Sequence, residues 1–312
     1  MSAITMSAIT TSAFPLRASL VIALTLATLG LGSRAEARAA RPTKAAGTAV
    51  NVDYTVNLAG FPIGTAQLAT AFEGSRYSMN VSAQLTGLAG AVTGGQGSAR
   101  ASGAVGQQPL PNAFTIATRT STSGVAVRMA MSNGNVSRAD VIPPLPDMGD
   151  RVPVTAAAKR GIVDPASALV MPVAGQGNPL DPGNCNRTIP VFDGATRFNV
   201  LLSYAETRQV EKPGYSGPVL VCNARYQAIG GHRPDRPGVR FMEENRDMSV
   251  WLAPVEGARV LLPLRISVRT TVGTNIIEAT RWSRSGPAPS GTAAAPQTNA
   301  DGAMAQANLA GR

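Results

Sequence analysis

Apolar and polar residues alternate along most of the middle of the chain, and this period of two constrains the fold more than any other feature. In the stretch TAVNVDYTVNLAG, Val50, Val52 and Tyr54 fall on one side of an extended chain and their polar neighbours on the other. Side chains of a β-strand point alternately to its two faces. This stretch is therefore predicted to be a half-buried strand with one polar face.

The same alternation recurs in segments bounded by turn residues, with no long helical pattern between them. The pair Asn133-Gly134 favours a tight hairpin turn. Pro263 indicates an edge or a bulge, because proline cannot donate a hydrogen bond within a sheet. The predicted strands are residues 65–72, 76–87, 112–120, 124–131, 185–194, 198–204 and 219–229, with three more between 248 and 283.

One stretch, VDPASALVMPV, is predicted to form a short helix, since Asp164 can cap it and Pro165 suits a first helical position. The Gly-rich residues 87–106 lack the spacing of a phosphate-binding loop and are interpreted as a flexible connection between strands. The expected fold is all-β: a strongly curled antiparallel sheet or open β-barrel-like domain with one short helix. A two-sheet sandwich is the alternative.

The ends of the chain differ in composition from its middle. Residues 1–37 have a positive charge, a short apolar run and small residues suited to cleavage, which predicts a signal peptide and a periplasmic location. Residues 38–47 are interpreted as a linker and 48–284 as a single β-rich domain. Residues 285–312, rich in Ala, Gly, Pro and Ser, are predicted to be a disordered tail.

The formal net charge of +10 is spread along the chain rather than gathered in dense runs. Such a surplus favours anionic envelope surfaces, and export argues against nucleic acid as a partner. No stretch after the signal peptide has the ~20 apolar residues that a membrane-spanning helix needs. The protein is therefore expected not to span the membrane after cleavage.

The chain contains two cysteines, Cys185 and Cys222. Exported proteins meet an oxidising environment, so the pair is predicted to form a disulfide. Closing this interval would stabilise the fold by about 4 kcal/mol if unfolded-chain entropy dominates. A metal or redox site is the alternative, but two isolated cysteines and one histidine make a poor ligand set. No metal or cofactor is expected.

Around the single histidine, His232, Arg233 and Arg236 form a candidate anion-binding loop, because guanidinium groups match phosphate and carboxylate. A solvated turn is the simpler interpretation of this stretch, rich in Gly and Pro. No Ser-His-Asp pattern appears, so no catalytic residue is predicted. A hydrolase relying on Asp193 or Asp235 is the enzymatic alternative, although Asp193-Gly194 favours a hairpin turn.

Several segments together resemble a family of bacterial exported proteins grouped as domain of unknown function 3108. They are DYTVNLAGFPIGTAQL, YSMNVSAQLTGL, GIVDPASALV, CNRTIPVFDGATRFNV, VCNARYQAIGG and LPLRISVRTTVGTNIIEAT. The resemblance covers residues 50–282. The resemblance implies a periplasmic, β-rich, non-enzymatic protein, distantly like the curled sheets of periplasmic lipoprotein carriers. It transfers no catalytic residue.

Two functions follow as expectations. The first is a non-enzymatic envelope protein with a structural or protein-interaction role, whose partner is another envelope protein; the low aromatic content favours it. The alternative is a carrier or binding module for a lipid, acylated or other hydrophobic ligand on the concave face of the sheet. Leu58, Val81, Leu202 and Ile266 are the predicted residues of that face.

Overall fold

The computed structural model describes residues 47–146, 149–173 and 175–286, most of which belong to one antiparallel sheet. The first half of the chain forms β1 (Thr48–Leu58), β2 (Phe61–Glu73), β3 (Arg76–Leu85), β4 (Gln96–Val105), β5 (Pro109–Arg119), β6 (Gly124–Ser132) and β7 (Asn135–Ile142). The second half forms β8 (Met171–Pro172), β9 (Arg187–Phe192), β10 (Arg197–Lys212), β11 (Tyr215–Gly230), β12 (Met248–Pro254), β13 (Val260–Thr270) and β14 (Gly273–Ser285).

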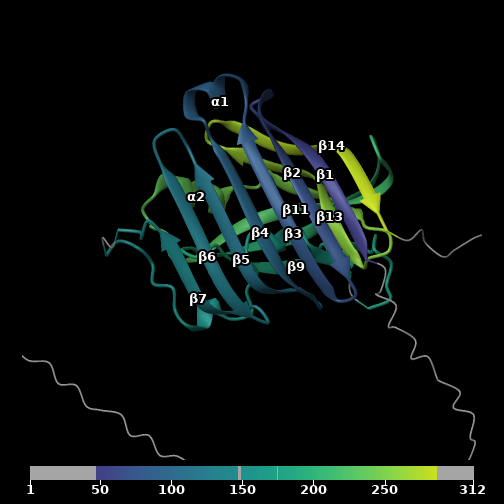
Figure 1. Cartoon of the computed structure of the whole chain (residues 1–312), viewed down its shortest axis with the longest axis horizontal. Coiled ribbons are helices and arrows are strands. Elements are labelled where there is room, and N and C mark those ends of the chain that lie inside the picture. The colour runs from purple at the N-terminus through teal and green to yellow at the C-terminus, as the bar shows by residue number, and fades with distance from the viewer. Residues whose placement is uncertain (1–46, 147–148, 174, 287–312) are drawn as a thin grey trace, which may run out of the picture. The chain divides into compact units, whose positions relative to one another are not determined.

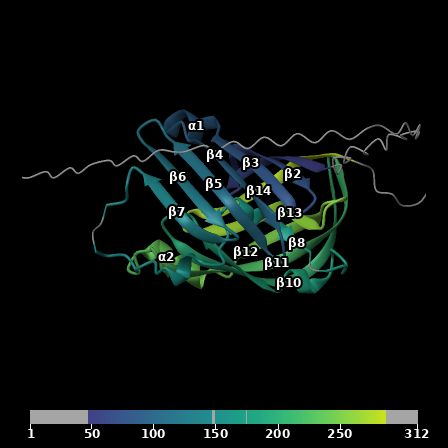
Figure 2. The same ribbon diagram turned by 60° about the horizontal axis from the view of Figure 1, so that its bottom comes forward.

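The strand order is β7-β6-β5-β4-β3-β2-β1-β14-β13-β12-β11-β10-β9, with β8 paired to β13. The strands β1 to β7 pair as successive hairpins. The chain then crosses to the opposite edge of the sheet, where β9 lies, and β10 to β14 pair in sequence until β14 meets β1. The strands β1–β7, coloured purple to teal, curl over β10–β13, coloured green to yellow-green (Figures 1 and 2). The predicted all-β, strongly curled, β-barrel-like sheet is confirmed, and the sheet is not closed.

The main hydrophobic core lies between the two halves of the curled sheet. Val52 and Leu68 come from the first half, and Val221 and Leu262 from the second. In β1 the buried residues alternate with more exposed ones, as the period of two predicts. Half-buried strands of this kind form the first half of the domain.

The second half differs, because β11 is buried on both faces. Val219 and Val221 belong to the main core, whereas their neighbours Leu220 and Cys222 belong to a second core. Residues 171–173 and 175–186 cover that second core with Met171, Val173 and Cys185. The expectation of a single polar face per strand is therefore wrong for β11. The near-continuous apolar run in its sequence indicates a strand that is buried on both faces.

The helices are short, and two of the sequence interpretations need correction. The Gly-rich residues 87–106 form the helix α1 (Gly87–Thr93) and the strand β4 rather than a flexible connection. In VDPASALVMPV only Ser167–Leu169 is helical, as a 3₁₀ turn. The second α-helix, α2 (Pro237–Glu244), follows the candidate anion-binding loop. Two more 3₁₀ turns cover Ala157–Lys159 and Pro182–Asn184.

Two backbone predictions are confirmed. The register of β12 and β13 shifts opposite Pro263, which places a bulge where proline breaks the pairing. The turn between β6 and β7 holds Asn133 and Gly134 at φ values of 49° and 76°. Two positive φ values suit the twist of a tight hairpin.

The predicted signal peptide and tail lie outside the described residues, as does the linker except for Gly47. Ser285 and Gly286, at the start of the predicted tail, are described, and Ser285 ends β14. Within the described ranges, neither α-helix has the length and apolar character to cross a membrane.

Candidate functional site

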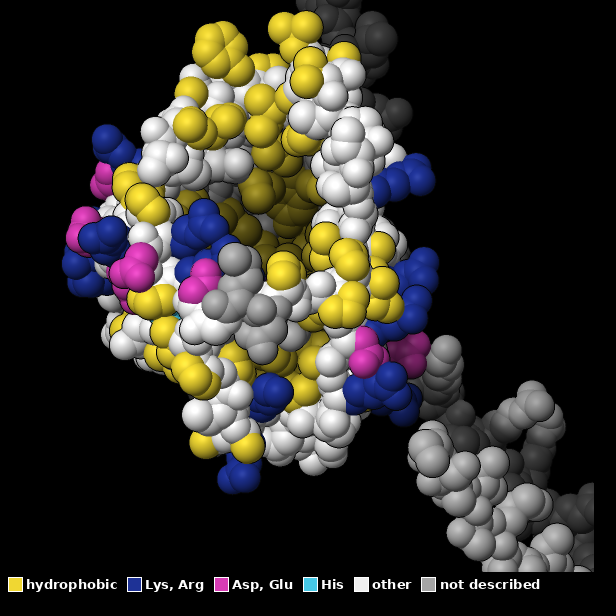
Figure 3. Space-filling view, turned by 90° about the vertical axis from the view of Figure 1, so that its left-hand side faces the viewer, with side chains coloured by type: hydrophobic (Ala, Val, Ile, Leu, Met, Phe, Trp, Pro, Cys, Tyr) yellow, Lys and Arg dark blue, Asp and Glu magenta, His cyan; other side chains and the backbone are white. Residues whose placement is uncertain are grey.

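An apolar groove opens between the two halves of the sheet, seen as the yellow-lined hollow in Figure 3. Its volume is about 470 Å³, within the ~300–1,000 Å³ typical of small-molecule sites. Most side chains that line it are hydrophobic, and several are only half-buried, so the groove is open to solvent. Its apolar lining includes Val56, Leu68, Val81, Leu85, Ile266 and Ile277.

A row of small residues on neighbouring strands leaves the open space of the groove. Cross-strand pairing aligns Ala66 of β2 with Ala83 of β3, and Ala83 with Gly97 of β4. One row deeper, the larger Leu68 and Val81 face each other. Since larger side chains at the first row would fill the space, the groove exists because these positions are small.

One residue of the groove lining comes from the segment between β7 and β9. Residues 161–173, called the crossover segment below, contribute Leu169 to the groove lining. Ile162 donates its backbone hydrogen to Gly134, in the turn after β6, at 2.9 Å. Val163 donates to Pro190 of β9 at 2.8 Å. The crossover segment thus joins the two sides of the open sheet.

A buried polar network fixes the crossover segment in the core. The Asp164 carboxylate accepts hydrogen bonds from the backbone of Ala166 and Ser167 at 3.0 and 2.9 Å, so it caps the 3₁₀ turn as predicted. It also accepts one from the Ser167 hydroxyl, which in turn accepts one from the Tyr77 hydroxyl at 2.7 Å. Asp164 and Ser167 are fully buried, so this network is a structural anchor and not an accessible reaction centre.

Burial raises the pKa of Asp164 to about 6, although the hydrogen bonds from Ser167 and Ala166 oppose the rise. In the unfolded chain this carboxyl has its ordinary pKa of 3.8. The folded state therefore binds the proton more tightly. The stabilisation that Asp164 provides is complete below its unfolded pKa and is lost as the pH rises through about 6.

We compare the free energy of unfolding of the protein with that of the variant Asp164→Asn. The first minus the second should fall by about 2 kcal/mol from about pH 4 to about pH 7. The subtraction removes the titration of all other carboxyls. Urea unfolding of both proteins at a series of pH values measures it. A difference that does not change with pH would contradict the raised pKa.

The rim of the groove is polar but carries little charge. Gln84, Gln96 and Arg119 come from the ends of β3, β4 and β5, and all three are exposed. With its amide oxygen turned towards β5, Gln96 accepts hydrogen bonds from Nε and Nη2 of Arg119 at 2.9 Å. On the opposite wall, the buried Tyr54 hydroxyl donates to the Pro263 carbonyl at 2.7 Å. That bond ties β1 to β13 beside the groove.

The sequence predicted part of this concave face. Val81 and Ile266 line the groove, as expected. Leu58 is half-buried at the end of β1, two residues beyond Val56. The placement of Leu202 is wrong, because it packs in the second core on the opposite face of β10 and β11. The small residues Ala66 and Ala83 were missed, although their alternation with polar residues put them on the inner face.

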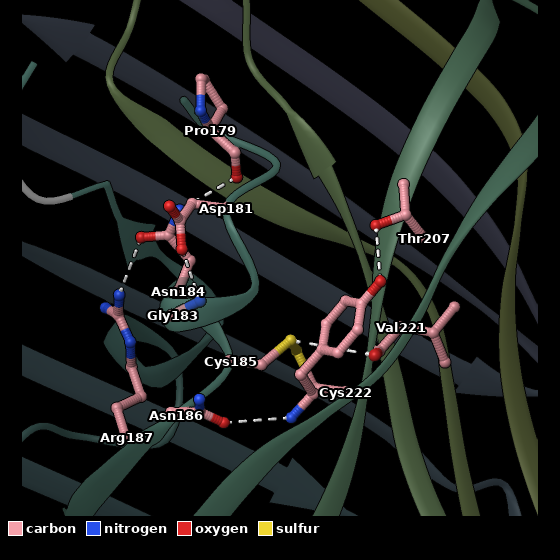
Figure 4. The surroundings of a disulfide bond; sticks show 11 residues. Pro179, Asp181, Gly183, Asn184, Cys185, Asn186, Arg187, Thr207, Val221 and Cys222 are labelled. Atoms are coloured by element: carbon pink, nitrogen blue, oxygen red, sulfur yellow. Dashed lines mark hydrogen bonds between the residues drawn. A yellow bond between two sulfur atoms is a disulfide. The ribbon is translucent and has the colours of Figure 1, made fainter. Parts of the chain in front are cut away.

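The disulfide predicted between Cys185 and Cys222 is present, with Cα atoms 5.5 Å apart (Figure 4). Cys185 precedes β9, and Cys222 lies on β11 opposite Tyr204 of β10. The bond therefore reaches across β10, and both cysteines are fully buried in the second core. The disulfide anchors the segment that covers the second core to the sheet.

Polar contacts hold the chain around Cys185 in place. Asp181 accepts a hydrogen bond from the Gly183 backbone at 2.7 Å, which caps the 3₁₀ turn (Figure 4). Arg187 donates to Asn184 at 3.3 Å and to the Pro172 carbonyl at 3.0 Å. Asn186 accepts from the Tyr204 backbone at 3.2 Å. The segment that covers the second core is thus held by several groups besides the disulfide.

The candidate anion-binding loop lies away from the groove. Arg233 forms an ion pair with Asp150 at 2.8 Å, and the His232 carbonyl accepts a hydrogen bond from Val152. Arg236 is exposed at the start of α2. Anion binding here stays a prediction, and the ion pair means that Arg233 already has an anionic partner.

Asp193 serves the turn in which it lies. Its carboxylate accepts hydrogen bonds from the backbone of Ala195 and Thr196 at 2.9 and 2.6 Å, which confirms the turn between β9 and β10. Asp235 is exposed in the loop before α2. Among the described residues, no three His, Cys, Asp or Glu side chains gather as metal ligands would. The absence of a cofactor and of an enzymatic reaction stays a prediction.

The chain is similar to a solved structure described as a β-barrel-like protein of domain of unknown function DUF1849 from Brucella abortus. The two share 8% sequence identity with a TM-score of 0.42, over 78% of this chain and 99% of the other. No curated protein gives a significant match. A family profile described as "Protein of unknown function (DUF3108)" matches residues 53–280. The match covers most of the chain, from β1 to β14, and the protein belongs to the DUF3108 family.

Proposed function

We propose that this protein is an exported, non-enzymatic binding protein that holds a hydrophobic ligand, such as an acyl chain, in the apolar groove. The observation that carries the proposal is the groove itself, whose wall is apolar although it is open to solvent. A ligand that fills it gains about 0.8 kcal/mol for each CH₂ group removed from water. The disulfide is consistent with export, and we propose the periplasm as the location.

The groove favours this function over the structural or interaction role that the low aromatic content had favoured. Aliphatic side chains and small residues line it, so few aromatic residues are needed to accept a flexible chain. Polar groups lie at the rim and not in the depth, which suits an amphiphile whose head group stays in water. A protein-interaction role in the envelope stays a prediction.

The test is a titration of the purified protein with cis-parinaric acid, a fatty acid that fluoresces when it leaves water. We expect a saturable rise in fluorescence that palmitate reverses and acetate does not, because acetate lacks the apolar chain. Mass spectrometry of a solvent extract checks for a ligand retained from the cell. The proposal fails if no lipid is extracted and the probe does not bind.

A further inference from the structure

The four most exposed large hydrophobic side chains of the described residues stand at one end of the sheet. Leu88 is 87% exposed, Val92 77%, Phe61 72% and Val272 70%. The next in rank, Ile142, is only 47% exposed. Scattered exposed apolar residues are normal, but a group that stands well above the rest and shares one location marks an interaction site.

Backbone contacts bring these four residues together at the mouth of the groove. Leu88 and Val92 lie one turn apart on α1, so they share one face of the helix. α1 is flanked by Leu85 and Gly95, and both line the groove. Its first residues contact the start of β2, where Thr86 donates to the Ile63 carbonyl at 2.9 Å.

The two remaining residues lie in neighbouring turns. Phe61 follows the turn between β1 and β2, and Val272 lies in the turn between β13 and β14. Ala59 donates its backbone hydrogen to the Thr274 carbonyl at 3.0 Å, which joins the two turns. Both turns adjoin the groove through Val56 and Ile277, which pair with each other. We call Phe61, Leu88, Val92 and Val272 the apolar rim.

The charges around the apolar rim fit one kind of partner. Four segments at this end, residues 55–68, 80–99, 115–127 and 266–277, contain no acidic residue, and beside them Asp247 forms an ion pair with Arg269 at 3.1 Å. The charged residues of the four segments are two arginines, Arg119 and Arg269, and the chain as a whole carries +10. A surface of apolar side chains whose net charge is positive suits the interface of an anionic bilayer.

We infer that the apolar rim docks onto the surface of a lipid bilayer with anionic head groups and inserts Phe61, Leu88, Val92 and Val272 into its interfacial layer. This inference rests on the proposed function for its purpose: an acyl chain would pass between bilayer and groove without crossing water. Docking itself needs no ligand. The apolar rim lies on the surface and spans nothing, as in proteins held by shallow apolar insertion.

The first test places an environment-sensitive dye at the apolar rim. Leu88→Cys is labelled with a nitrobenzoxadiazole dye without reductant, so that the native disulfide stays intact. We expect a blue shift and a rise in emission on adding phosphatidylglycerol vesicles. Ser75→Cys, labelled in the exposed turn between β2 and β3 at the opposite end of the sheet, should give no change. Docking is wrong if the dye at residue 88 does not respond.

The second test removes the apolar side chains. Leu88→Ser with Val92→Ser should weaken co-sedimentation with phosphatidylglycerol vesicles by about tenfold or more, since each aliphatic side chain contributes over 1 kcal/mol on burial. The matched control is Leu201→Ser with Ile229→Ser, two exposed aliphatic residues on β10 and β11. Both pairs should fold normally, because none of these four side chains is buried. Equal binding by the two pairs would overturn the inference.

The two proposals fail separately. A protein that responds to vesicles but does not bind cis-parinaric acid keeps the docking surface and loses the ligand-binding function. A protein that binds the probe while its label at residue 88 stays unchanged keeps the function and loses the docking surface. A partner protein at the apolar rim would give this second outcome.

Discussion

Replacing Ala83 by phenylalanine is expected to weaken the binding of cis-parinaric acid by about tenfold or more. Ala83 lies in the middle of the row of small residues and lines the groove. A phenyl ring there would occupy space that the ligand needs, and binding would lose the burial of several CH₂ groups at about 0.8 kcal/mol each. Because Ala83 is exposed to the groove, the larger side chain should be accommodated without unfolding the protein.

Ser82→Phe is the matched control for this substitution. Ser82 is the next residue of β3, so its side chain points to the opposite face of the sheet. It pairs with Gln67 and Ser98, and neither Ser82 nor Ser98 lines the apolar groove. Probe binding should be unchanged in this variant. Equal effects of the two substitutions, or tight binding by Ala83→Phe, would show that the probe binds elsewhere.

Loss of the disulfide is expected to have the largest effect on stability. Replacing Cys185 and Cys222 by alanine should lower the free energy of unfolding by about 4 kcal/mol, because the unfolded chain regains the freedom of a 37-residue interval. The same change removes the covalent anchor of the segment that covers the second core. Urea unfolding, with and without a reducing agent, measures the effect.

The reducing agent provides the internal control. It should destabilise the natural protein and leave the double alanine variant unaffected, since that variant has no cysteine. A loss of less than about 1 kcal/mol would mean that the unfolded state is already compact, or that the contacts of the second core hold the covering segment without the bond.

The period of two predicted most of the strands, but it missed β7 and the two-residue β8. It failed for β4, whose inward residues Ala99, Ala101 and Gly103 are too small to give an apolar signal. These small side chains face larger ones on β3, such as Met79, which pairs with Ala101. The helix α1 also escaped prediction, because it has no charged residue and Thr86 makes no capping hydrogen bond with its side chain.

Alternation predicts which residues share a face of a strand, but not which of two apolar faces turns to the groove. Leu202 was placed wrongly for this reason, since both faces of the neighbouring β11 are buried. The capping role of Asp164 could be predicted, because its partners lie two and three residues away. The link from Ser167 to Tyr77 could not, because 90 residues separate them and only the curl of the sheet brings them together.

The pairing of β1 with β14 affects how the protein folds during its synthesis. These two strands lie side by side in the middle of the sheet, yet residues as far apart as Ala49 and Ser285 must meet to form them. Contacts of such long range make folding slow. Until the ribosome has released the final strand, β1 and β13 present bare edges open to aggregation, so a holding chaperone would benefit the nascent chain.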